Sequence, residues 1–401
     1  MTDLEIDFVC SLVKKVKPSA TIAVSMKAAE LKRAGKDVIG LGAGEPDFDT
    51  PDHIKAAAIA AINAGQTKYT AVDGTPELKQ AVINKFHREN GLDFAANQIL
   101  VSCGAKHSIS NLLNAVLNPD DEVIIPAPYW VSYPDMVLLA GGVSVIVDTT
   151  QEQDFKMTAM QLENAISDKS RIIILNTPSN PTGKAYRKSE LQALGEVLLK
   201  YPHVMIASDD IYEHIYWGEE EITNLGVLFP ELIDRMVFIN GVSKAYAMTG
   251  WRIGYAAGPV DVITAMRKIQ SQSTSNACSI SQAAAVAALD GDQSCLQPMK
   301  KAFKERHDWL ISALNTISGF SCIEGEGAFY AFPNVKAAIM KIDGIHNDVE
   351  FSTWLLEKAQ VAVVPGTPFG MPGHVRLSFA TSLHNLQKAV KRIADSVNKF
   401  F

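Results

Sequence analysis

The chain has 401 residues, 47% of them hydrophobic and 20% charged, and a formal net charge of -7 at pH 7. A chain of this length exceeds the usual size of one domain, so we expect two domains. The negative charge argues against a nucleic-acid-binding surface. Because no run of 18 apolar residues occurs and the N-terminal sequence is acidic, we expect neither a membrane span nor a secretory signal.

The cysteines and histidines show no pattern typical of a cross-link or a metal site. The nine histidines form no H-x-x-x-H pair, and no two cysteines have C-x-x-C spacing. The cysteines are odd in number and scattered, at Cys10, Cys103, Cys278, Cys295 and Cys322. We therefore expect reduced thiols in a cytoplasmic protein, with no disulfide framework and no bound metal.

The first hundred residues begin with a segment that has no clear period. Residues 1–17 are therefore predicted to form an N-terminal arm. Apolar spacing predicts a helix over residues 20–34 and another over 52–64, with a strand over 37–41 between them. A Gly-Thr-Pro sequence that ends at Pro76 is typical of the start of a further helix.

From residue 98 onward, short apolar strands alternate with helices. The predicted strands are 98–102, 122–125, 143–147, 171–175, 204–207 and 236–239. The predicted helices between them are 105–117, 130–140, 158–166 and 187–200. This alternation is the signature of a mostly parallel sheet covered by helices, so the fold class is α/β.

The last hundred residues have a different pattern. A long amphipathic stretch over residues 295–317 is predicted to leave the parallel layer. Mixed strand and helix signals follow, with strands at 329–332, 361–364 and 375–379 and helices at 348–359 and from 383. We expect a large domain over residues 49–300, and a smaller α+β domain formed by residues 18–48 together with 301–401.

Glycine-rich turns and polar side chains follow the ends of the predicted parallel strands. They are Gly104, Ala105 and Lys106, then Trp130, Asn180, Asp209 and Tyr212, and finally Ser243 and Lys244. Because ligands bind outside the carboxyl ends of the strands in open α/β sheets, we expect these residues to share a site. Each also has a simpler interpretation, as a turn, a helix cap or core packing, which local sequence alone does not exclude.

Lys244 has unusual neighbours for a lysine. It follows a predicted buried strand closely, and small or apolar residues surround it, with almost no other charge before Arg252. An amine in apolar surroundings loses its proton more easily, and Schiff-base chemistry requires the neutral amine. The hydroxyl of Ser243 and the guanidinium of Arg252 suit a phosphate monoester.

The segment from Ser243 to Tyr255 reads S-K-A-Y-A-M-T-G-W-R-I-G-Y. It resembles the cofactor-lysine signature of class I (fold type I) pyridoxal-phosphate aminotransferases, and N-P-T-G at residues 180–183 is a second strong signature of that family. From about Lys17 to the C-terminus, the chain is similar to the bacterial aspartate aminotransferase branch, which includes aspartate/prephenate aminotransferases. The resemblance implies a mostly parallel sheet in a large domain, a smaller α+β domain, and pyridoxal 5'-phosphate as the cofactor.

The resemblance also implies roles for individual residues around the cofactor ring. Lys244 matches the lysine that carries the cofactor and moves the substrate's α-proton, and Asp209 matches the aspartate that keeps the pyridine nitrogen protonated. Asn180 and Tyr212 match the partners of the cofactor's phenolic oxygen. Trp130 matches the aromatic residue that stacks on the pyridine ring.

Around the cofactor phosphate, the resemblance implies a second set of residues. They are Gly104, Ala105, Lys106, Ser243 and Arg252, with Tyr69 reaching the phosphate of the neighbouring subunit. A tyrosine shared in this way implies a symmetric homodimer with shared active sites.

Arg376 matches the arginine that binds the substrate's α-carboxylate as a bidentate pair, and Gly44 matches a backbone contact to substrate. Trp130 and Asn180 also border the substrate. The segment that supplies an arginine for the second carboxylate in another branch of the family has none here, so Lys106 is the candidate for that role. The alternative is that Lys106 only neutralises the cofactor phosphate.

The predicted function is that of a dimeric aminotransferase which moves an amino group between L-aspartate and 2-oxoglutarate. An aromatic or prephenate aminotransferase of the same family is the alternative. In a different class, Gly241-Val-Ser243-Lys-Ala245 is one residue short of the G-x-S-x-G nucleophile motif, so a serine hydrolase that uses Ser243 with His374 is a rival. A transcription regulator built on this fold is disfavoured, because the chain has no room for a DNA-binding domain.

Overall fold

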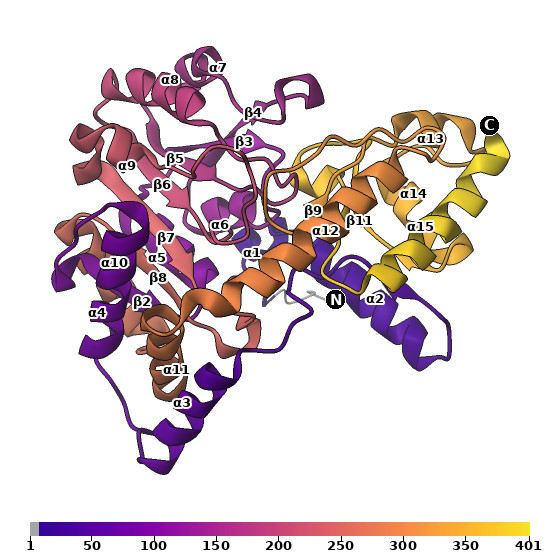
Figure 1. Cartoon of the computed structure of the whole chain (residues 1–401). Helices are drawn as coiled ribbons and strands as arrows, with labels where there is room; N and C mark the ends of the chain where they lie inside the picture. The colour runs from indigo at the N-terminus through magenta and orange to yellow at the C-terminus, as the bar shows by residue number, and fades with distance from the viewer. Residues whose placement is uncertain (1–7) are drawn as a thin grey trace, which may run out of the picture.

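A seven-stranded sheet lies at the centre of the larger part of the molecule (Figure 1). The computed structural model describes residues 8–401. The strand order is β2-β8-β7-β6-β5-β3-β4, and β8 alone in this sheet runs antiparallel to its neighbours. The strands are β2 (Ile99–Ser102), β3 (Glu122–Ala127), β4 (Val143–Asp148), β5 (Ser170–Asn176), β6 (Met205–Asp209), β7 (Met236–Gly241) and β8 (Gly254–Ala257). The mostly parallel sheet predicted from the sequence is confirmed.

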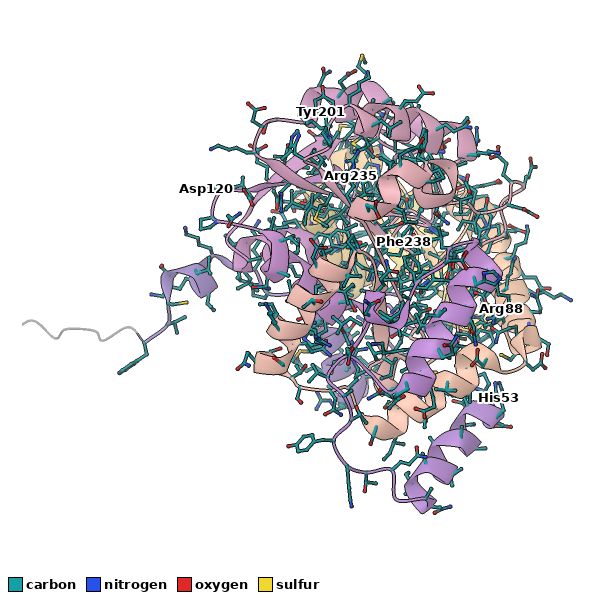
Figure 2. All side chains as sticks on the ribbon, turned by 90° about the vertical axis from the view of Figure 1, so that its left-hand side faces the viewer. His53, Arg88, Asp120, Tyr201, Arg235 and Phe238 are labelled. Carbon is teal, nitrogen blue, oxygen red and sulfur yellow. The ribbon has the colours of Figure 1, made fainter. Side chains whose placement is uncertain are left out.

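Both faces of this sheet are covered by helices, which explains why the middle of each central strand is continuously apolar. In β5, Ile172 and Ile174 belong to the core on one face, and Ile173 and Leu175 belong to the core on the other. Strands buried on both sides do not alternate between polar and apolar residues. Phe238 on β7 lies deep among the surrounding side chains (Figure 2).

The helices divide between the two faces by their apolar contacts. On one face α5 (Ala105–Val116), α6 (Tyr133–Leu139) and α10 (Val260–Ser273) supply the core. The other face is covered by α3 (Asp52–Asn63), α4 (Pro76–Lys85), α7 (Ala159–Ala165), α8 (Lys188–Leu199), α9 (Leu225–Leu228) and α11 (Ser279–Asp290). The helices predicted over this part of the sequence are present, with ends displaced by a few residues.

Two smaller sheets lie to one side of the large one. One pairs β1 (Ile39–Gly40) with β10 (Val361–Ala362) in parallel, and the other has the antiparallel order β11-β12-β9. The strands of the second are β9 (Tyr330–Ala331), β11 (Val364–Pro365) and β12 (Val375–Ser378). The helices beside them are α2 (Ala20–Arg33), α13 (Lys336–Lys341), α14 (Asp348–Lys358) and α15 (Leu383–Val397).

The helix α12 (Leu296–Leu314) connects the two regions. It runs diagonally between them in Figure 1, from the end of α11 to a contact with α15. Its buried side chains Met299, Phe303 and Leu310 belong to the core that also contains β9 and β12. The boundary predicted at residues 300 and 301 therefore falls inside one continuous helix.

Part of the predicted N-terminal arm is helical. A five-residue helix, α1 (Ser11–Lys15), projects from one side of the molecule in Figure 2 and contacts α6. Residues 1–7 of the predicted arm lie outside the described residues. No sequence pattern predicted the π-helical turn over Phe86–Asn90, which extends α4. Over residues 8–401, none of the helices is both long enough and apolar enough to span a bilayer.

Candidate active site

A pocket of ≈250 Å³ lies at the carboxyl ends of β5, β6 and β7, between the large sheet and the smaller ones. All the residues predicted for the site line this pocket except Gly104 and Tyr69. Residues from the two regions meet here, because Gly44, Tyr330 and Arg376 come from the side of the small sheets. This is the place at which an open α/β sheet binds its ligands.

Lys244 lies three residues beyond β7, and its amine points into the pocket. Its Nζ donates a hydrogen bond of 2.6 Å to the backbone oxygen of Gly44. Burial lowers the pKa of Lys244 to about 8, and the nearby cations Arg252 and Arg376 add to that effect. An amine with this pKa is partly neutral near physiological pH, so it can act as a nucleophile and carry a proton.

Asp209 is the last residue of β6 and provides a carboxylate at the floor of the pocket. It accepts a hydrogen bond of 2.6 Å from the hydroxyl of Tyr133, and its backbone oxygen accepts one of 2.8 Å from Asn176 Nδ2. Burial raises the pKa of Asp209 to about 6, against the effect of the Tyr133 hydrogen bond. The carboxylate is therefore held in one place without a directly paired cation.

Arg376, on β12, provides a buried cation in the same pocket. Its Nη1 donates 2.9 Å to Asn180 Oδ1, and its Nη2 donates 2.8 Å to the backbone oxygen of Gly42. The guanidinium carbon lies 4.3 Å from the ring centroid of Tyr330. Arg376 Nε is buried and has no hydrogen-bond partner among the residues that the structure describes. A fixed guanidinium of this kind is suited to bind a carboxylate.

A third group of residues forms a site for an anion. The N-terminus of α5 at Ala105 and Lys106, the hydroxyl of Ser243, and Arg252 all line the same pocket. Free backbone N–H groups at a helix start favour phosphate binding. Gly104 precedes this helix with a φ of +90°, and a Cβ at that position would lie 2.3 Å from Arg252 Nη2, so only glycine fits. Gly104 thus shapes the site without lining it.

Lys106 adds a further cation beside Trp130. Its Nζ lies 4.9 Å from the Trp130 ring centroid. Burial lowers the pKa of Lys106, and Arg252 acts in the same direction. Lys106, Lys244, Arg252 and Arg376 are thus four cations in a lining whose one carboxylate is Asp209, which suits a ligand with several anionic groups.

Three residues that hold polar groups of the site were not predicted from the sequence. Tyr133 and Asn176 hold Asp209, and Tyr330 contacts both Tyr212 and Arg376. Tyr133 follows Trp130 by three residues at the start of α6, a spacing that could have been noticed. Tyr330 lies in a predicted apolar strand, and nothing in the sequence next to it marks it as a site residue.

Tyr69 lies outside the pocket. Its side chain is 91% exposed in the single chain. A tyrosine that reaches into a neighbouring subunit has to be exposed in this way. The serine hydrolase alternative lacks a base, because no histidine lines the pocket over the described residues. His374 instead stacks on Phe332, with ring centroids 5.1 Å apart.

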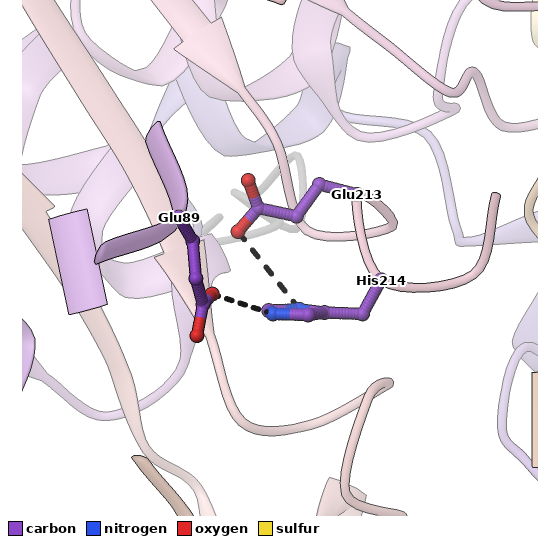
Figure 3. Close-up of side chains that lie close together, drawn as sticks. All are labelled: Glu89, Glu213 and His214. Atoms are coloured by element: carbon purple, nitrogen blue, oxygen red, sulfur yellow. Dashed lines mark hydrogen bonds and ion pairs between the residues drawn. The ribbon is translucent and has the colours of Figure 1, made fainter. Parts of the chain in front are cut away.

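Glu89, Glu213 and His214 form a separate cluster of side chains of the metal-ligating type (Figure 3). His214 Nε2 lies 2.8 Å from Glu89 Oε2. The fully buried amine of Lys85 forms ion pairs with both glutamates. The charge of the carboxylates is therefore balanced by a lysine, and this cluster does not line the candidate active site.

A family model described as aminotransferase class I and II matches residues 36–393. The chain belongs to this family. Two of its relatives are an aspartate/prephenate aminotransferase of Nitrosomonas europaea, 58% identical over 95% of this chain and 98% of that protein, and an aspartate aminotransferase of Geobacillus stearothermophilus, 51% identical over 95% of this chain and 96% of that protein.

Solved structures of the family have the same fold. The aspartate aminotransferase from Rhizobium meliloti superposes with a TM-score of 0.94 at 47% identity, and covers 98% of this chain and 99% of its own. The aspartate aminotransferase from Thermus thermophilus with maleate superposes with a TM-score of 0.91 at 42% identity, and covers 97% of this chain and all of its own. The predicted aminotransferase family and its fold are confirmed.

Proposed function

We propose that this aminotransferase uses pyridoxal 5'-phosphate to move an amino group between L-aspartate and 2-oxoglutarate. The observation that carries the proposal is the content of one pocket: a lysine amine with a pKa of about 8, an isolated buried carboxylate, and three further cations. Transamination needs each of these groups. The names of the relatives support aspartate as the amino donor.

The residues present fit the proposed cofactor. Asp209 is a buried carboxylate without a cationic partner, which suits a protonated pyridine nitrogen, and Trp130 offers a flat ring. The N-terminus of α5, Ser243 and Arg252 suit a phosphate. Asn180 and Tyr212 offer polar groups for a phenolic oxygen, and Lys244 an amine for the carbonyl. The cofactor supplies an electron sink for the substrate's α-carbon when bound.

The remaining chemistry falls to the chain's own residues. Arg376 binds the α-carboxylate and fixes the orientation of the substrate. Lys244 Nζ can accept the proton of the substrate's α-carbon and give it up again, since an amine with a pKa of about 8 exchanges protons readily near neutral pH. Asp209 stays ionised because Tyr133 donates to it.

Recognition of a second carboxylate is assigned to Lys106. Ser19 and Thr21, at the start of α2, line the same pocket and can close over that carboxylate. Maleate, named with one of the structural neighbours, is itself a dicarboxylate. Lys106 therefore supports an acidic substrate.

Prephenate is a second candidate substrate, since it also carries two carboxylates and is named in several relatives. An adjoining groove of ≈440 Å³ shares Thr21, Ile22 and Gly44 with the pocket. This groove offers room for a ring larger than an aspartate side chain.

The proposal extends to assembly and movement. We infer a cytoplasmic homodimer in which Tyr69 of each subunit completes the phosphate site of the other. The exposure of Tyr69, Phe8 and Val13, and the projection of α1 from one side of the molecule, support a contact between subunits (Figure 2). Residues 18–48 with 301–401 would move as one domain on the other, formed by residues 49–300.

Single half-reactions test the proposal. Purified protein loaded with pyridoxal phosphate is mixed with a panel of amino donors, and the change in cofactor absorbance is recorded. Aspartate and glutamate should react fastest, and Asp209→Asn should slow the reaction with aspartate by about 100-fold or more, because an amide does not keep the ring nitrogen protonated. A donor panel without any reaction, or an unaffected Asp209→Asn variant, contradicts the proposal.

A further inference from the structure

Tyr330 lines the pocket and contacts two of its other residues, Tyr212 and Arg376. Its hydroxyl oxygen is 2.9 Å from that of Tyr212. The face of its ring lies 4.3 Å from the guanidinium carbon of Arg376. Its hydroxyl also lies 3.0 Å from where a Cβ on Gly44 would be, so only a glycine leaves this space free. Tyr330 is buried, and its backbone pairs with Ser378 in the antiparallel sheet. The backbone from which the ring projects is therefore held in place.

The contact between the two tyrosines has a direction that charge decides. A phenol has one hydrogen to donate, so one hydroxyl of the pair donates and the other accepts. Burial raises the pKa of both hydroxyls, so both stay protonated and either could donate to the other. The ionised phenolic oxygen of the proposed cofactor can only accept, so Tyr212 donates to it and Tyr330 in turn donates to Tyr212.

This direction leaves the hydrogen of Tyr212 available to the pocket. Among the described residues, Tyr212 has no other side-chain or backbone acceptor for its hydroxyl hydrogen. The oxygen of Tyr212 accepts from Tyr330, so its own O–H must point elsewhere, and Tyr212 lines the pocket. A hydroxyl fixed in this way donates to an anionic oxygen without first having to reorient.

The other contact of Tyr330 fixes a cation. The guanidinium of Arg376 lies between two rings, with Tyr330 at 4.3 Å and Phe369 at 5.1 Å from its carbon. Its two terminal nitrogens are held by Asn180 and Gly42. The plane of the guanidinium is therefore set before a carboxylate arrives.

We propose that Tyr330 is a positioning residue with two separate effects: its hydroxyl directs the hydrogen of Tyr212 toward the phenolic oxygen of the bound cofactor, and its ring holds Arg376 in the plane that receives the substrate's carboxylate. The inference rests on the proposed function, because it takes the cofactor and the carboxylate from there. It gives one side chain two roles in the site.

Two substitutions separate the effects. Tyr330→Phe keeps the ring and removes the hydroxyl, whereas Tyr330→Leu removes both. Tyr186→Phe is the matched control, since it deletes another interior tyrosine hydroxyl, one that accepts a hydrogen bond from Met157 N outside the pocket. Each purified variant is loaded with pyridoxal phosphate, its absorbance is titrated with pH, and maleate is then added as a dicarboxylate that has no amino group to transfer.

In Tyr330→Phe, the pH midpoint of the absorbance change should rise by about 0.4–1 unit, because an anionic phenolic oxygen loses a directed hydrogen bond. Its dissociation constant for maleate should stay within about twofold of the parent value, since the ring still faces Arg376. In Tyr330→Leu, the midpoint should rise likewise and the dissociation constant should increase about 3- to 30-fold. Tyr186→Phe should match the parent in both measurements.

A Tyr330→Phe midpoint equal to that of the parent overturns the hydroxyl's role, and undiminished maleate binding by Tyr330→Leu overturns the ring's role. Failure of the proposed function has a different outcome. In that case the parent itself shows no pH-dependent cofactor absorbance and no maleate response, whatever the variants do.

Discussion

Two ionisable side chains in the pocket have pKa values displaced toward neutrality from opposite directions. Burial raises that of Asp209 to about 6 and lowers that of Lys244 to about 8. In the protein without ligands both displacements lower stability at pH 7. The cost from Asp209 develops as pH rises from its unfolded value to about 6, and the cost from Lys244 develops as pH falls from its unfolded value to about 8. Ligand groups of opposite charge remove both costs when they bind.

The low pKa of Lys244 predicts an unusual pH profile for its reactivity. When apoprotein, pyridoxal phosphate and borohydride are combined, the rate at which the cofactor becomes fixed to Lys244 should rise with pH around a midpoint near 8, because the neutral amine is the reactive form. Peptide mapping by mass spectrometry measures the adduct. A midpoint close to that of an exposed lysine, or an adduct on another lysine, would contradict the assignment.

Substrate choice should depend on Lys106. Lys106→Met should reduce kcat/KM for aspartate by about 30-fold or more, in line with the loss of a partly buried charge pair. Alanine and phenylalanine lack the second carboxylate, so their kcat/KM should change little. An equal loss for all three donors would instead show that Lys106 serves the cofactor phosphate.

The predicted residues that follow strands directly meet in the pocket. Asp209 and Lys244 could be predicted because consecutive parallel strands bring their carboxyl ends to one edge. Tyr133 and Tyr330 could not, since each acts through a partner far away in the chain: Tyr133 on Asp209, and Tyr330 on Tyr212 and Arg376. A contact between distant segments leaves no local pattern.

At the scale of elements, α4 is attached to the loop after β6 by a buried ion pair. Lys85, in the last turn of α4, is fully buried and pairs with Glu213. Burial alone would raise the pKa of Glu213, but Lys85 and His214 bring it below its ordinary value. Asn90 and Asn240 donate to the same carboxylate.

Breaking this pair should be costly. Lys85→Met should lower the free energy of unfolding by about 3–5 kcal/mol, because Glu213 would remain buried and uncompensated. Urea unfolding at pH 7 measures the loss. The difference from the parent should narrow as pH falls, since the variant's Glu213 can then bind a proton and shed its charge.

Lys200→Met is the matched control. Lys200 pairs with Glu163 at 3.0 Å, but both side chains are largely exposed, so this substitution should leave unfolding nearly unchanged. Equal effects of the two substitutions would mean that the buried pair contributes no more than a surface one.

Most elements could be predicted because apolar periodicity determines them. The strands of the large sheet other than β8, and the helix α12, are examples. The helix α1 could not be predicted, since none of its residues is buried and its sequence has no period to detect. The place of β8 between β2 and β7 could not be predicted either, because strand order depends on packing across the whole sheet.

For the whole molecule, the proposed shared site makes a prediction about mixed dimers. Lys244→Ala and Tyr69→Ala subunits should each form weakly active or inactive homodimers. When they are unfolded together and refolded, about a quarter of parental activity should return, because half the dimers are mixed and each then holds one site with both residues intact. The specific activity of the dimer fraction after size-exclusion chromatography measures this recovery. Recovery no greater than the average of the two homodimers would place Tyr69 in the site of its own subunit.

The lysine and the arginine of the pocket are attached to different hydrophobic cores. Lys244 is flanked by Val242 and Ala245 of the large sheet's core, whereas Arg376 is flanked by Val375 and Leu377 of the core that includes α12 and α15. A mutation that repacks the second core can shift Arg376, which binds the carboxylate, while Lys244 stays in place. Within a lineage, preference for one acid over another can therefore drift while the reaction itself is inherited intact.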